Sequence, residues 1–142
     1  PHLFIARKAG FRELISFDKL GVEYPYTSVV VLRQTAAKNP ELVERFLKCL
    51  VEGIHIFKTN KAKTLAAFKR YMKGADDDIL EESYQHTRAT APYPSLQVVK
   101  GGLDMLSLQY PQAKQTDASL IVDPSFMKKI DDSGFIRTLY RK

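Results

Sequence analysis

The chain has 142 residues, a length typical of one domain. Its hydrophobic share of 44%, with seven Tyr and eight Phe, is enough to build a core and too high for a disordered chain. The net charge of +6 comes from Lys and Arg that occur singly or in pairs, without the basic stripe of nucleic-acid-binding proteins, so we expect no nucleic-acid partner.

The first part of the chain predicts two short strands. Residues 3–9 are apolar-rich and stop at Gly10, a natural left-handed helix cap. FRELISF alternates imperfectly, as a short strand does, and SVVVLRQ indicates a buried strand because three Val and a Leu follow one another. A buried strand needs neighbours on both edges, so we expect these to come from outside this chain or from a second copy of it.

The longest predicted helix lies in KNPELVERFLKCLVEGIHIF, residues 38–57. Asn39 is a good N-cap, Pro40 takes the first helical position, and Glu41 favours the positive end of the helix dipole. Apolar residues then recur at steps of three and four, which predicts one buried face. The members of that face are Val43, Phe46, Leu47, Leu50, Ile54 and Phe57.

Further helices are predicted as far as the last residues. Their start signals are a cap at Thr59 or Asn60, the acidic triplet 76–78, Ser95, and Asp123-Pro124. The first of them ends at Gly74, and Gly134 precedes a short final segment, FIRTLYRK. The patterns together predict one or two strands and six or seven helices.

Residues that could carry chemistry are sparse. The three histidines are scattered singly, no paired metal-ligand spacing occurs, and no phosphate-binding loop or nucleophile elbow is present. Cys49 lies near the apolar stripe and is interpreted as a small packed residue, and the acidic triplet as a helix cap. The sequence therefore predicts no catalytic residue, no metal site and no cofactor.

One segment, GVEYPYTSVVVLR, has the composition of a small-ligand cleft. Aromatic faces with hydroxyl groups at the entry of a strand provide stacking area and a few fixed hydrogen bonds. The alternative is a turn with packed tyrosines, and the residues alone favour that alternative.

Four pieces of the chain carry a family likeness when taken in order: AGFREL, KNPELVERFL, IHIFKTNKAKTL and DDSGFIRTLY. Over nearly its whole length the chain resembles the C-terminal half of solute-binding proteins of ABC importers. The closest branch is the one for nitrate, sulfonate, taurine and thiamine-precursor-like ligands. Family members are longer, and the half absent here would be the N-terminal one, which holds the signal peptide.

The resemblance implies an α/β fold, a helix-rich part of the type II periplasmic-binding-protein fold with about two strands in this chain. Residues 1–34 would be the end of the second lobe and the crossover or hinge strand, and residues 35–142 the helical part that packs on the lobes. By position in the family, His2, Tyr26, Thr27 and Ser28 would face the ligand cleft. Tyr24 is a fifth candidate.

The function implied is the capture of a small anionic or aromatic solute between two lobes, followed by hinge closure and delivery to an ABC permease in the membrane. The place of action would be periplasmic, or extracellular at the membrane. The alternative is a helix-rich interaction or oligomerisation domain that keeps the scaffold without transport, as a strand-swapped homo-oligomer. An enzyme is not expected, because the cysteine-rich motif of the precursor-synthesising relatives is absent.

Overall fold

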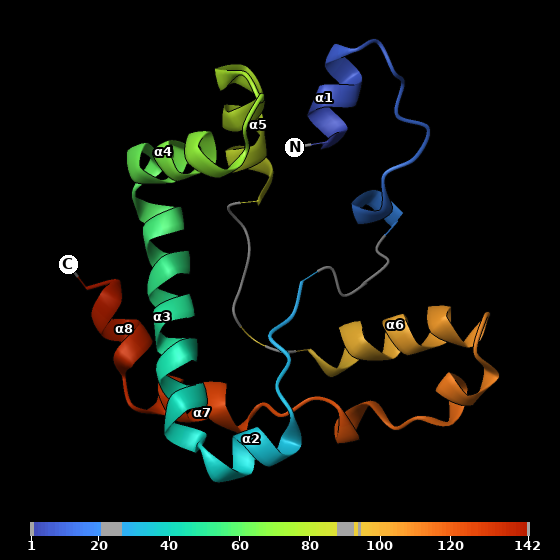
Figure 1. Cartoon of the computed structure of the whole chain (residues 1–142), viewed down its shortest axis with the longest axis vertical. Helices are drawn as coiled ribbons and strands as arrows, with labels where there is room; N and C mark the ends of the chain where they lie inside the picture. The colour runs from blue at the N-terminus through green and yellow to red at the C-terminus, as the bar shows by residue number, and fades with distance from the viewer. Residues whose placement is uncertain (1, 21–26, 88–92, 94, 142) are drawn as a thin grey trace.

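A computed structural model of the chain describes residues 2–20, 27–87, 93 and 95–141, and all of its regular elements are helical (Figure 1). In chain order these are α1 (His2–Lys8), η1 (Phe17–Leu20), α2 (Arg33–Lys38), α3 (Pro40–Thr59), α4 (Lys61–Tyr71), α5 (Asp77–Thr87), α6 (Leu96–Ser107), η2 (Pro111–Gln115), η3 (Ala118–Leu120), α7 (Ser125–Asp132) and α8 (Phe135–Leu139). The three η elements are 3-10 helices.

The predicted α/β fold is therefore wrong: the described residues contain no strand, and the arrangement is not a type II periplasmic-binding fold. The end of FRELISF enters η1, and the end of SVVVLRQ enters α2. The reason is that a strand exists only as part of a ladder, and no other described segment pairs its backbone with residues 28–31, while the Leu32 carbonyl accepts from the Ala36 N–H of α2. High β-propensity alone does not supply that partner.

Several helix start and end signals in the sequence are confirmed, although the Asn39 side chain makes no capping hydrogen bond to α3. Pro40 occupies the first turn of α3, and the Asn60 side chain accepts a hydrogen bond from the Lys63 backbone N–H at 3.0 Å at the start of α4. Ser95 caps α6 in the same way, through the Val98 N–H at 3.2 Å. Gly10 and Gly74 follow α1 and α4 with φ values of 86° and 83°, in the left-handed region that glycine reaches without strain.

The main core lies where α3 meets α7 and α8, and Figure 1 shows α8 alongside the long helix and α7 at its lower end. Ile130 of α7 is completely buried there. The other buried members are Val43, Leu47, Val51 and Met127. Sequence periodicity predicted Val43 and Leu47 on this face, and both are buried.

A second, smaller packing group joins α4 and α5 to the C-terminal end of α3. Tyr84 is buried, and its ring meets that of Phe57 edge-on at a centroid distance of 5.6 Å. Ile79 and Leu80 of α5 are buried beside it. α1 lies against α5, where Lys8 forms ion pairs with Asp76 and Asp78.

Candidate functional site: an exposed apolar surface

The predicted ligand-cleft residues do not come together in the described structure. His2 is exposed in the first turn of α1, whereas Thr27 and Ser28 are exposed at the start of the segment that leads to α2. No described contact joins His2 to either of them. Tyr24 and Tyr26 lie outside the described residues, so the cleft that the resemblance implies stays a prediction.

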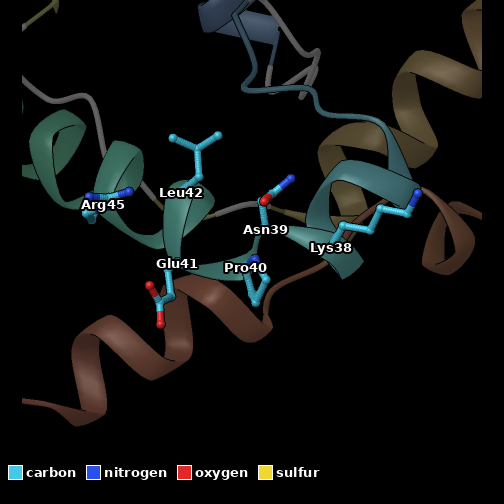
Figure 2. Close-up of a pocket in the computed structure, with 6 residues that line it drawn as sticks. All are labelled: Lys38, Asn39, Pro40, Glu41, Leu42 and Arg45. Carbon is cyan, nitrogen blue, oxygen red and sulfur yellow. The ribbon is translucent and has the colours of Figure 1, made fainter.

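The junction of α2 and α3 forms an open hollow with a volume of about 260 Å³ (Figure 2). Its lining consists of Lys38, Asn39, Pro40, Glu41, Leu42 and Arg45. The side chains drawn in Figure 2 point away from one another, so they present no convergent polar groups to a small molecule. We assign no ligand to this hollow.

A second hollow, of about 320 Å³, lies between α4 and α5. Of the three charged residues that line it, Lys69 and Asp77 already form an ion pair with each other at 2.8 Å. Glu81, which also lines it, is paired with Lys61 at 2.7 Å, and that ammonium group lowers the pKa of Glu81. The charges here join helices to one another, and none is left to recognise a ligand.

The acidic triplet 76–78 also joins one helix to another. Lys8 donates to the carboxylates of Asp76 and Asp78, and its hydrogen bonds lower the pKa of Asp78. No group of three or more His, Cys, Asp or Glu side chains that could hold a metal ion occurs among the described residues. The triplet thus begins α5 and attaches α1 to it.

The dominant feature of the molecule is its large accessible surface. That surface is 11152 Å², whereas a compact monomer of this mass exposes about 7,500 Å². More than twenty large hydrophobic residues are at least a third exposed on this surface. A monomeric protein rarely leaves so much apolar area in water.

The most continuous part of this surface is the apolar run Val29–Leu32. All four side chains are exposed, and Val30 is 87% exposed. The run is followed directly by Arg33, whose guanidinium Nη2 donates to the Leu120 carbonyl at 2.8 Å and so fixes one end of the run beside η3. The sequence predicted these residues as a buried strand; instead they are presented to solvent without a partner among the described segments.

A second part lies on α3, and we call it the α3 stripe: Leu42, Phe46, Cys49, Gly53 and Ile56. All five residues are exposed, Leu42 by 53% and Phe46 by 55%. Sequence periodicity predicted Phe46 inside and Cys49 packed, and both predictions are wrong. The alternating steps of four and three residues between stripe members could have shown a separate face, because that spacing is typical of helix pairing.

Within the described part of the chain, no helix combines the length and the apolar character that crossing a membrane requires. Comparison with protein-family models, with curated proteins and with solved structures finds no match to this chain.

Proposed function

We propose that the chain is a helix-rich interaction module that acts as a homo-oligomer, in which a second copy covers the exposed apolar surface. The observation that supports this proposal is the accessible surface of 11152 Å². It exceeds the surface of a compact monomer by about 3,700 Å². Each partner in a standard protein–protein interface contributes about 800 Å², so the excess is several times what a stable contact needs.

The apolar run Val29–Leu32 is the segment best suited to be buried in such an assembly. It combines high β-propensity with backbone groups at Val29–Val31 that bond to no other described residue, and an added strand can satisfy those groups in the manner of β-augmentation. A second copy offers the same run, so each copy can supply the neighbour that the other lacks.

The positive charge opposes self-association only at long range. With a net charge of +6 two copies repel each other, but at physiological ionic strength this repulsion is screened beyond about 8 Å. Contact of apolar surface acts at shorter distances and does not depend on charge. Added salt should therefore increase the oligomer fraction.

The test is the molar mass in solution, measured by light scattering on a size-exclusion column. We expect a mass of at least twice 16.2 kDa at micromolar protein concentration. Val30→Lys places a charge in the run and should shift the distribution towards the monomer. Gln109→Lys adds the same charge at an exposed polar position and should leave the mass unchanged. A stable monomer with a sharp unfolding transition would contradict the proposal.

Solute capture and delivery to a permease stay predictions from the family resemblance, as does the expected periplasmic or extracellular location. No described contact favours them over assembly. Neither of the two hollows described above is a closed cavity, and in neither do free hydrogen-bonding groups converge on one point.

A further inference from the structure

The α3 stripe has the shape of a self-complementary helix face. It runs from Leu42 to Ile56, about 21 Å along the helix axis, on the longest helix of the described structure. Its midpoint is Cys49, which is exposed. The stripe borders the buried face of α3, and Figure 1 shows that α7 and α8 do not surround the helix.

An antiparallel pairing of two α3 helices about Cys49 places the largest residue of the stripe, Phe46, opposite its smallest, Gly53. When two copies of α3 cross in opposite directions about a two-fold axis at Cys49, Leu42 of one copy comes opposite Ile56 of the other. Phe46 then comes over Gly53, where a Cβ atom would meet nothing within 4 Å. An aromatic ring can thus reach the helix backbone at the residue that has no side chain.

The charges beside the stripe favour the same orientation. Arg45 and Glu52 flank it, both are exposed, and neither forms an ion pair with another described residue. The antiparallel crossing brings Arg45 of one copy beside Glu52 of the other, whereas a parallel two-fold pair would hold the two residues on opposite sides of the contact and form no such pair. Glu44 and Lys48, towards the other side of the helix, already pair with each other at 2.9 Å.

We propose that α3 pairs antiparallel with α3 of a second copy, with Cys49 at the two-fold axis. This inference rests on the proposed homo-oligomer and adds a helix contact to the pairing of the Val29–Leu32 runs. Helices pack at interaxial distances of about 8–10 Å, with Cα atoms about 2.3 Å from each axis. The two Cys49 Cα atoms would then be roughly 3.5–5.5 Å apart, which overlaps the range that a disulfide spans.

The first experiment is oxidation of the full chain with diamide. The two Cys49 thiols lose their hydrogen atoms to the diazene, which becomes a hydrazine, and an S–S bond forms between the copies. We expect most of the protein to become a covalent dimer on a non-reducing gel, at a rate independent of dilution as long as the non-covalent dimer persists. Cys49→Ser should abolish the product.

A relocated cysteine provides the matched control. In Cys49→Ser with Ala67→Cys the only thiol is on α4, at another exposed helix position. We expect this variant to cross-link at least ten times more slowly than the native chain. Equal rates would mean random collision and would overturn the proposal.

The second experiment reverses the two flanking charges. Arg45→Glu and Glu52→Arg should each raise the dimer dissociation constant several-fold, and the double variant should restore it, because each new Arg again meets a Glu of the other copy. Lys100→Glu changes the net charge by the same amount as Arg45→Glu, away from the stripe, and is the control for that variant. The two positions are seven residues apart in one helix, too far for an i,i+4 pair to explain the rescue. Failure of the double variant to rescue would contradict the antiparallel contact.

The mass measurement separates the two proposals. A dimeric mass without a Cys49 disulfide overturns the α3 contact and leaves the homo-oligomer standing. A monomeric mass without the disulfide overturns both. A dimeric mass with rapid Cys49 oxidation and charge-swap rescue supports both.

Discussion

Glu44 is the best example of a single side chain that holds two helices together. Lys129 of α7 donates to its carboxylate at 2.7 Å, and Lys48 lies 2.9 Å away on α3 itself. The hydrogen bond from Lys129, followed by that from Lys48, lowers the pKa of Glu44 from 4.5 to about 2. The carboxylate is therefore more stable in the folded chain than in the unfolded one.

This shift predicts an acid-dependent loss of stability. Because the folded pKa is lowered, the stabilisation is fully present above pH 4.5 and is lost as the pH falls towards 2. We expect the free energy of unfolding of the native chain to exceed that of Glu44→Gln at pH 7, with the difference shrinking to near zero at pH 2. Urea unfolding at fixed protein concentration measures it.

The control for this experiment is Glu82→Gln on α5, an exposed glutamate without an ion pair among the described residues. Its difference from the native chain at pH 7 should be small, because Glu82 forms no ion pair with another described residue. A constant difference for Glu44→Gln between pH 7 and pH 2 would contradict the role of the carboxylate.

At the scale of elements, the helix starts were predictable because their signals are local. Asn60 and Ser95 cap α4 and α6 as their sequence positions predict, and Gly10 and Gly74 end helices with positive φ. The strands were not predictable, since a ladder depends on a partner far away in sequence or in another molecule. Periodicity likewise showed that α3 is apolar over a wide arc, but not which part of the arc other helices cover.

Two asparagines allow the capping rule to be tested within one protein. Asn39 and Asn60 both occupy N-cap positions, but only Asn60 accepts a side-chain hydrogen bond, from Lys63. Asn60→Ala should lower the free energy of unfolding by about 1 kcal/mol, and Asn39→Ala by clearly less, as measured by urea unfolding. Equal losses would show that the Lys63 bond contributes nothing.

At the scale of the whole molecule, the small fraction of surface that is buried lowers the free energy of unfolding of a single copy. The chain buries about half of the surface that its unfolded form exposes, whereas a compact domain of this length buries about 68%. A lone copy therefore has less apolar burial to oppose the conformational entropy of unfolding. We propose that contact with a second copy supplies the missing burial.

That deficit predicts a melting temperature that depends on concentration. If the oligomer is the folded form, diluting the protein a hundredfold should lower the melting temperature by several degrees, because dissociation favours the unfolded chain. Differential scanning fluorimetry over this range is the measurement. Val30→Lys should melt lower than Gln109→Lys at every concentration. A melting temperature that is independent of concentration would contradict association-dependent folding.

The exposed run Val29–Leu32 also has a consequence for the newly made chain. An uncharged, β-branched segment without proline is a template for cross-β stacking as well as for ordered pairing. Arg33, at its end, places a positive charge against the growth of such a stack. Ordered assembly and fibre formation thus compete for the same backbone groups, so a second copy that pairs with the run early also keeps it out of a fibre.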